Sequence, residues 1–221
     1  MVTAGTKALL FDLDGTLLPS DPLHYEVFAE MFRERGKTLT PEIYERRIHG
    51  HHNLDSFPVL FPGEDPQALS DDKEARFRRR LSHGTPPMPG AAALLDRADA
   101  QGWRLAVVTN APRENGEYML DAIGLRDRFE LLVIGDECER AKPDPEPYIA
   151  AMRMLDVKPQ DCIAFEDSPS GMRAAATCGA YPVGVRSGLT EDRLREAGAK
   201  ATIADYEDPA LDGILKRLET S

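Results

Sequence analysis

The amino-acid sequence predicts an α/β fold that carries an all-helical insertion, and three observations support this. Short apolar runs, typical of buried strands, alternate with longer segments of helical periodicity over most of the 221 residues. The runs are apolar at successive positions, as expected for strands buried on both faces of a parallel sheet. Between residues 19 and 85 the alternation stops and only helical patterns remain. Together these features favour a Rossmann-like parallel sheet with helices on both faces and a helical cap inserted after the first strand.

Six apolar runs are predicted as strands. The first run, Ala8–Phe11, ends in the turn-forming sequence Asp-Leu-Asp-Gly. The later runs, in chain order, are Leu105–Val108, Leu131–Ile134, Cys162–Phe165, Pro182–Val185 and Ala201–Ala204.

Helical patterns lie between these runs. Glycine ends two of them, at Gly102 and at Gly124, as is common just after the last turn of a helix. The predicted helices are Ala91–Ala100, Arg113–Ile123, Glu146–Leu155, Pro169–Cys178 and Glu191–Ala197.

The insertion contains three helix-like segments and no convincing strand. They are Leu23–Arg35, Pro41–Ile48 and Ser70–Leu81, with Ser70 as the predicted cap of the last one. The proline-rich segment Pro86–Pro89 is the predicted return hinge. We therefore expect a core of residues 1–18 and 86–221 and a cap of residues 19–85.

Composition and charge narrow the classes of partner. With 42% hydrophobic and 29% charged residues, the chain can bury a sizeable core. Its net charge of −11 should repel nucleic acids and anionic membranes, so neither is an expected partner. The three cysteines show no disulfide or zinc spacing, and the N-terminus lacks the long apolar stretch of a signal peptide. We expect a cytoplasmic protein, with a monomer as the default.

The polar residues that follow the apolar runs predict a common site, because ligands bind at the carboxyl ends of parallel strands. Carboxylates gathered there repel one another unless a cation separates them, and Mg²⁺ is the hard cation that prefers such oxygens. A hydroxyl and an ammonium beside them suit the oxygens of a phosphoryl group. The sequence therefore predicts a phosphoryl-transfer site, without the glycine-rich loop of P-loop enzymes. Its residues are Asp12, Asp14, Thr109, Asn110, Lys142, Glu166 and Asp167.

Four segments resemble the motifs of the haloacid dehalogenase superfamily. In chain order they are Phe11–Leu18, which matches DxDGT[LV], then Val108–Asn110, Lys142–Pro143 and Phe165–Gly171. Each follows an apolar run or lies in a loop. The resemblance covers nearly the whole chain, and the insertion is similar to the helical cap of the phosphoglycolate-phosphatase and β-phosphoglucomutase branch.

The resemblance implies the catalytic roles. Asp12 would be the nucleophile that takes the phosphoryl group, and Asp14 would be the general acid that protonates the leaving oxygen and then activates water. Asp14 also favours phosphoryl transfer over dehalogenation, because a halide leaving group needs no proton. The implied Mg²⁺ ligands are Asp12, the Asp14 backbone carbonyl and Asp167, with Glu166 supporting the metal indirectly or through water. The implied phosphate ligands are Thr109, the Asn110 backbone amide and Lys142.

Three cap residues are candidate substrate ligands by the same resemblance. His24 lies ten residues after Asp14 and could hydrogen-bond to Asp14 or to the substrate. Lys73 resembles a cap lysine that reaches the substrate, with a solvated helix face as the alternative. Asn53 stands where β-phosphoglucomutases carry an arginine that binds a second phosphate, which speaks against mutase activity.

Two further patterns have alternative interpretations. His49, His51 and His52 lie in a segment, Ile48–Ser56, that is predicted as the cap's specificity loop; a zinc site is the alternative. The basic run at Arg76 and residues 78–80 is interpreted as a solvated helix face, although it could instead attract anionic substrates.

The prediction for function is a cytoplasmic, Mg²⁺-dependent phosphatase, a phosphoric monoester hydrolase, acting through an aspartyl-phosphate on Asp12. Its substrate would be a small phosphorylated metabolite of the sugar phosphate or phosphoglycolate type, because a cap covers the site. One alternative is a β-phosphoglucomutase-like hexose-phosphate mutase. An alternative of another class is a non-catalytic, phosphate-binding regulatory protein on the same fold.

Overall fold

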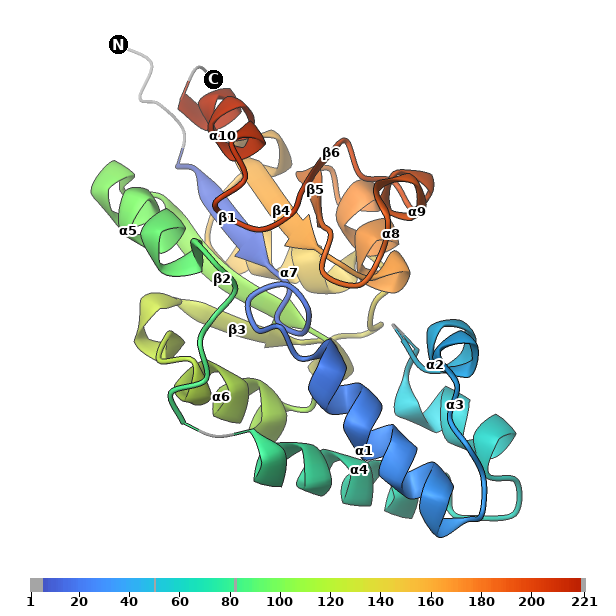
Figure 1. Ribbon diagram of the computed structural model, residues 1–221. Coiled ribbons are helices and arrows are strands. Elements are labelled where there is room, and N and C mark those ends of the chain that lie inside the picture. Colours follow the sequence, from blue (N-terminus) through green and yellow to red (C-terminus); the bar gives the residue numbers. More distant parts are fainter. Residues whose placement is uncertain (1–5, 50, 82, 220–221) are drawn as a thin grey trace.

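The computed structural model describes residues 6–49, 51–81 and 83–219, which form one sheet with helices on both sides (Figure 1). In this part of the chain the sheet has six parallel strands in the order β3-β2-β1-β4-β5-β6. All the predicted strands are confirmed. They are β1 (Ala8–Phe11), β2 (Arg104–Thr109), β3 (Leu131–Ile134), β4 (Cys162–Glu166), β5 (Tyr181–Val185) and β6 (Ala201–Ile203).

Successive residues of the central strand β1 point to opposite faces of the sheet, and helices bury both faces. Leu9 and Phe11 pack with α5, α6 and α10, whereas Ala8 and Leu10 pack with α7 and α8. This explains why the strands are apolar throughout. The core helices are α5 (Ala91–Gln101), α6 (Arg113–Ala122), α7 (Glu146–Met154), α8 (Pro169–Thr177), α9 (Glu191–Glu196) and α10 (Ala210–Glu219), with short 3-10 turns η1 (Arg126–Arg128), η2 (Gly135–Glu137) and η3 (Pro159–Asp161).

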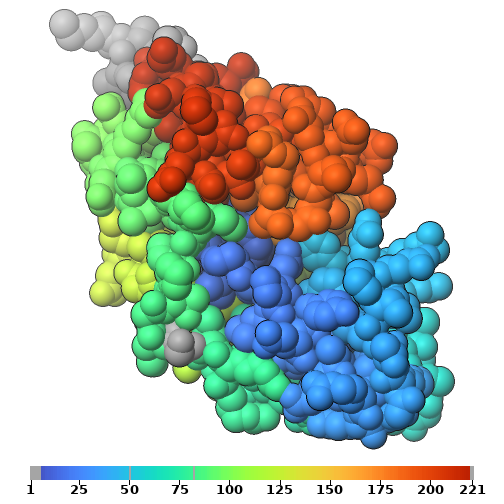
Figure 2. All heavy atoms as spheres, in the orientation of Figure 1, coloured from blue at the N-terminus to red at the C-terminus, as the bar shows by residue number. Residues whose placement is uncertain are grey.

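Between β1 and α5 the described residues form the four helices of the cap: α1 (Asp21–Glu34), α2 (Pro41–Arg47), α3 (Asn53–Leu60) and α4 (Pro66–Arg80). They lie beyond the carboxyl end of β1 (Figure 1). In Figure 2 the blue and cyan residues of the cap lie beside the orange residues of the C-terminal half. The predicted fold class is thus confirmed, while the domain boundaries after residues 18 and 85 stay predictions. No helix in the described ranges has the length and apolar character needed to cross a membrane.

Three helix predictions need correction. Ser70 is not a cap: α4 begins a turn earlier, where the Asp65 side chain accepts hydrogen bonds from the backbone amides of its first turn and a proline follows at the first helical position. Helix α3 begins within the predicted specificity loop, of which residue 50 lies outside the described residues, and continues beyond it to Leu60 with Pro58 inside the helix. Helix α10 was not predicted, although four of its residues are buried at helical spacing.

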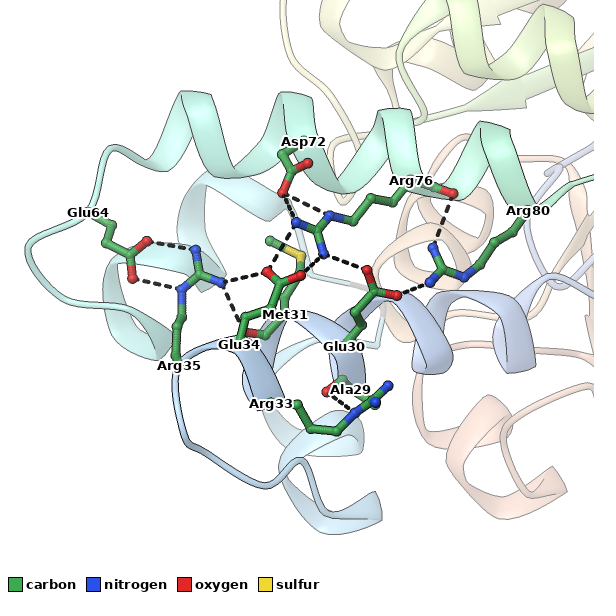
Figure 3. Close-up of polar contacts among 10 residues, drawn as sticks. All are labelled: Ala29, Glu30, Met31, Arg33, Glu34, Arg35, Glu64, Asp72, Arg76 and Arg80. Carbon is green, nitrogen blue, oxygen red and sulfur yellow. Dashed lines mark hydrogen bonds and ion pairs between the residues drawn. The ribbon is translucent and has the colours of Figure 1, made fainter.

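The basic run of α4 is only partly a solvated face: Arg79 is exposed, whereas Arg76, Arg78 and Arg80 each pair with a carboxylate. The Arg76 guanidinium, only 14% exposed, donates to Glu30 at 2.8 Å and Glu34 at 2.5 Å on α1, and to Asp72 at 2.9 Å on its own helix (Figure 3). Arg80 pairs with the same Glu30. These ion pairs join α1 to α4, because Glu30 and Glu34 of α1 face the guanidinium groups of α4.

Candidate active site

The ends of β1, β2 and β4 bring the predicted site residues together at one cavity of about 740 Å³, lined by core and cap; all of them line it except Glu166, which is fully buried. Asp12 follows β1, and Thr109 is the last residue of β2. Glu166 ends β4 and Asp167 follows it, while Lys142 enters from the loop before α7. The volume lies within the range of small-molecule sites.

Lys142 is the central cation of the core side. Its Nζ donates to Asp12 Oδ1 at 2.7 Å, to Glu166 Oε1 at 2.5 Å and to the Val108 carbonyl at 2.6 Å. The Tyr148 hydroxyl donates to the same Glu166 oxygen at 2.8 Å. Burial alone would lower the pKa of the Lys142 ammonium, but the charges of Asp12 and Glu166 outweigh it and raise the pKa. Lys142 therefore stays charged beside the Asp12 carboxylate.

Asn110 fixes the backbone of Lys142. Its Nδ2 donates to the Lys142 carbonyl at 3.0 Å, and its Oδ1 accepts from the Lys142 amide at 3.2 Å. The sequence predicted only a backbone role for Asn110. Thr109 is buried and lines the cavity, and its hydroxyl oxygen accepts from the Ala111 amide at 3.0 Å.

Three buried carboxylates form a candidate metal centre. Oxygens of Asp12, Glu166 and Asp167 lie within 4.8 Å of one another. Burial and the charges of Glu166 and Asp167 raise the pKa of Asp12 well above its usual value, against the opposing charge of Lys142. Burial also raises the pKa of Asp167 to about 6. Carboxylates that repel one another in a buried site, with only oxygen donors, fit a hard divalent cation such as Mg²⁺.

The turn after β1 positions Asp167. Thr16 Oγ1 donates to Asp167 Oδ1 at 3.2 Å, and Ser187 Oγ donates to Oδ2 at 3.3 Å. Gly15 has φ of 70°, and a Cβ there would lie 2.6 Å from the Asp167 Cγ. Only glycine fits this turn without moving the carboxylate.

The Asp14 side chain points toward the cap and does not join the candidate metal centre of Asp12, Glu166 and Asp167. Its Oδ1 lies 2.8 Å from His24 Nε2 and accepts from the Ser20 hydroxyl at 2.8 Å. Burial would raise the pKa of Asp14, but the hydrogen bond and charge of His24, helped by Lys73 and Ser20, lower it from its usual value. Among the described residues the Asp14 carboxylate belongs to no candidate metal cluster, so a metal role would fall to its backbone carbonyl.

The other two cap candidates line the same cavity but are bound to a carboxylate that the sequence did not single out. Glu74 Oε1 accepts from Asn53 Nδ2 at 2.7 Å and from Lys73 Nζ at 2.8 Å. Asn53 Nδ2 also donates to Ser70 at 3.1 Å. The structure thus places both residues at the cavity wall, and their contact with a substrate stays a prediction.

The three cap histidines do not gather around a common point. His49 Nε2 is buried without a hydrogen-bond partner in the described residues, 3.6 Å from Asp21 Oδ1 and 3.9 Å from Asp167 Oδ2. His52 is the N-cap of α3. Among the described residues His49 joins Asp21 and Asp167 in one group that could hold a metal ion, but His51 and His52 are not part of it, so the geometry does not support a zinc site built from the three histidines.

Several residues of the site had not been identified from the sequence. Ser168 has a local signal, because a serine before proline is a common helix start, and its hydroxyl accepts from the Gly171 amide at 3.0 Å at the beginning of α8. Ser20 has one as well, since it precedes Asp21-Pro22 at the start of α1 and hydrogen-bonds to Asp14 close by in the sequence. Glu74 and Tyr148 carry none, because only the fold brings Asn115 and Glu166 to them.

The chain is similar to known phosphatases over most of its length. It is 30% identical to the phosphorylated carbohydrates phosphatase of Thermotoga maritima, over 91% of this chain and 95% of the relative. It is 31% identical to the phosphoglycolate phosphatase of Rhodospirillum rubrum, over 90% of this chain and 88% of the relative. These relatives support the prediction of a phosphatase.

Structural similarity extends over the core and the cap together. The crystal structure of CbbY from Rhodobacter sphaeroides in complex with xylulose-(1,5)bisphosphate has a TM-score of 0.77 at 28% identity, covering 91% of this chain and 95% of that one. The sequence-family model of the haloacid dehalogenase-like hydrolases matches residues 6–179 of this chain. With its four motifs converging on one cavity, the chain belongs to the haloacid dehalogenase-like hydrolase family.

Proposed function

We propose that this protein is a Mg²⁺-dependent phosphatase that hydrolyses small phosphate monoesters through an aspartyl-phosphate on Asp12. The observation that carries the proposal is the pair of aspartates with different surroundings. Asp12 is buried against Lys142 at the metal centre, while Asp14 is hydrogen-bonded to His24 at the cap. Two carboxylates in unlike environments are what a nucleophile and an acid–base residue require.

The carboxylates of Asp12 and Asp167 and the Asp14 backbone carbonyl would hold the Mg²⁺. Glu166 would act indirectly, because its Oε1 is occupied by Lys142 and Tyr148. When bound, the ion neutralises the charge between the phosphate oxygens and the carboxylates.

In the first step an Asp12 oxygen bonds to phosphorus while the bond from phosphorus to the ester oxygen breaks. Asp14 gives a proton to that leaving oxygen: His24 lowers the pKa of Asp14, and the negative charge of a phosphate bound beside it would raise that pKa and favour the protonated acid. In the second step water bonds to phosphorus, Asp14 takes the proton of this water, and Asp12 leaves as a carboxylate with release of inorganic phosphate. The His24 ring, 2.8 Å from Asp14, orients this carboxyl group toward the leaving group.

Lys142, the Thr109 hydroxyl and the Asn110 amide would bind the remaining phosphoryl oxygens. The positive charge of Lys142 offsets the negative charge that both the phosphoryl group and the acidic cluster bring to a protein of net charge −11. Its backbone is held by the Asn110 side chain, so the ammonium is positioned before a substrate arrives.

The mutase alternative has less support. It requires a second phosphate to be bound, and Asn53, at the predicted position for that contact, has its amide bonded to Glu74 and Ser70. The regulatory alternative is disfavoured because every catalytic position of the motifs is filled. A cytoplasmic location and the lack of nucleic-acid or membrane partners stay predictions from the sequence, and a monomeric state stays the default.

The test is Mg²⁺-dependent phosphate release from a panel of phosphorylated metabolites, for the wild type, Asp12→Asn and the control Asp127→Asn on η1. We expect release that stops with a chelator, survives in the control and falls at least about a thousand-fold in Asp12→Asn. Isomerisation of a hexose phosphate without release would instead identify a mutase. If neither phosphate release nor isomerisation is observed, the regulatory alternative remains.

A further inference from the structure

The cavity has a second polar wall, which combines hydrogen-bond donors and acceptors where the candidate metal centre gathers carboxylates. Glu74 lies at its middle: Oε1 accepts from Asn53 and Lys73, and Oε2 accepts from Asn115 Nδ2 on α6. Ser70 completes the group through Asn53. We name Asn53, Ser70, Lys73, Glu74 and Asn115 the Glu74 cluster; it joins α3 and α4 of the cap to α6 of the core, and all five residues line the cavity.

The cations of this wall are already matched by carboxylates. The Lys73 ammonium lies 2.8 Å from Glu74, which is only 8% exposed. Arg78, which donates to Asn115 Oδ1, lies 3.3 Å from Glu114. A second anionic group on the substrate would therefore approach a buried carboxylate, and any cation it paired with would first leave its present partner. Approaching the buried Glu74 carboxylate and freeing Lys73 from it both cost free energy, whereas the pair of Arg78 with Glu114, whose side chain is 75% exposed, is weak.

The hydrogen-bonding groups of the wall suit hydroxyls instead. A hydroxyl both donates and accepts, whereas a carboxylate or phosphate group at neutral pH only accepts. The Glu74 cluster offers acceptors in its carboxylate and amide oxygens and donors in Lys73, the amides and Ser70. Uncharged substrate hydroxyls can use both kinds of group, but an anion can use only the donors.

We propose that the substrate is a phosphate monoester whose leaving group is an uncharged polyhydroxyl chain or ring. This inference rests on the phosphatase function proposed above. Glu74 is the specificity-determining residue that rejects a second anionic group. Sugar and polyol monophosphates fit this description, whereas phosphoglycolate, with its carboxylate, and sugar bisphosphates do not. A cavity of about 740 Å³ holds a six-carbon monophosphate.

The first experiment measures kcat/KM with Mg²⁺ for glucitol 6-phosphate and glucose 6-phosphate against phosphoglycolate and fructose 1,6-bisphosphate. 4-Nitrophenyl phosphate, which lacks hydroxyls and a second anion, reports on the catalytic centre alone. We expect a preference of about ten-fold or more for one of the polyhydroxyl monophosphates, the size of one hydrogen bond to a charged group. Equal or better use of the two competitors that carry a second anionic group, with 4-nitrophenyl phosphate hydrolysed, overturns the inference but leaves the phosphatase intact. No hydrolysis of any of the five compounds overturns the phosphatase itself.

The second experiment assigns the specificity to Glu74. In Glu74→Gln the Lys73 ammonium loses its countercharge, so the ratio of kcat/KM for phosphoglycolate to that for the preferred monophosphate should rise by about ten-fold. The matched control is Asp72→Asn, which removes the same charge from the same helix at the ion pairs of Figure 3. A rise in activity toward phosphoglycolate cannot come from misfolding. An unchanged ratio in Glu74→Gln, or an equal shift in Asp72→Asn, overturns the assignment.

Discussion

A single methyl group at residue 15 would disturb the candidate metal centre. The backbone of Gly15 has φ of 70°, and its Cβ position coincides with the Asp167 carboxylate. In Gly15→Ala we expect kcat/KM to fall by about a hundred-fold or more, because displacing a ligand by about an ångström has effects of that size. Steady-state phosphate release measures this.

The backbone strain of that substitution can be separated from its effect on Asp167. Gly36 has φ of 66° and nothing within 4 Å of its Cβ position. Gly36→Ala therefore carries a similar backbone cost, on the order of 1 kcal/mol, without touching the site. If Gly15→Ala kept wild-type kcat/KM, or Gly36→Ala lost it equally, the steric explanation would be wrong.

Tyr148 positions the pair of Glu166 and Lys142. Its hydroxyl donates to Glu166 Oε1 at 2.8 Å, and the Lys142 Nζ lies 5.0 Å from the centre of its ring. Tyr148→Phe keeps the ring and removes the hydrogen bond, so we expect kcat/KM to fall by about ten-fold with the fold intact. Tyr118→Phe, which removes a hydroxyl bonded to the Leu81 carbonyl at 3.2 Å, is the control and should retain full activity. Equal activities of the two variants would contradict the role of Tyr148.

These residues show which parts of a site a sequence can predict. Asp12, Asp14 and Asp167 were found because each follows a strand within a short motif, so neighbours in sequence reveal them. Glu74 meets Asn115 across 41 positions and Tyr148 meets Glu166 across 18, between elements that only the fold brings together. A local pattern carries no information about such partners.

At the scale of elements, Asp208 holds the start of α10. Its Oδ1 accepts from the Ala210 amide at 3.0 Å and its Oδ2 from the Ala204 amide at 2.8 Å. These two hydrogen bonds, with the charge of Arg186, lower the pKa of Asp208. A lowered pKa means that the ionised carboxylate is favoured in the folded state, so its stabilisation is complete above the unfolded pKa of ~3.9 and disappears as the pH falls through the lower folded pKa.

In Asp208→Ala we expect the free energy of unfolding to fall by about 1 kcal/mol at neutral pH, the usual contribution of a helix cap. The difference from the wild type should shrink as the pH drops below about 4. Chemical denaturation at several pH values measures it, with Glu207→Ala, at an exposed neighbouring carboxylate, as the control. A difference that grows toward acid pH would contradict the lowered pKa.

Elements were predictable where one physical signal dominated. The six strands were found because burial on both faces makes them short and continuously apolar. Helix α3 was missed because Pro58, a residue that usually interrupts helices, lies inside it. The start of α4 was misplaced because a serine inside the helix, Ser70, resembles a cap, whereas Asp65 followed by proline is the true start.

At the scale of the whole molecule, the buried carboxylates of the candidate metal centre lower the stability of the fold. Asp12, Glu166 and Asp167 are buried together, and the pKa of both Asp12 and Asp167 is raised. A raised carboxyl pKa means that folding disfavours the ionised form, so at neutral pH these charges oppose folding until a cation joins them. The proposed phosphoryl-transfer function, which needs a metal there, accounts for the burial of these charges.

If a cation offsets the repulsion between these carboxylates, Mg²⁺ binding should raise the stability of the protein. Mg²⁺ at a hundred times its Kd should stabilise the wild type by about 2.7 kcal/mol, which raises Tm by roughly 5–10 °C for a chain of this size. Asp167→Asn should lose this shift, because a ligand is gone, and should match or exceed the wild type in Tm in chelator, because the repulsion is gone as well. Calorimetry of both proteins, with Asp96→Asn at an exposed carboxylate of α5 as the control, makes the comparison. A variant that loses the Mg²⁺ shift and is also less stable in chelator would show that Asp167 supports the fold through Thr16 and Ser187, and the conflict between stability and function at this centre would not exist.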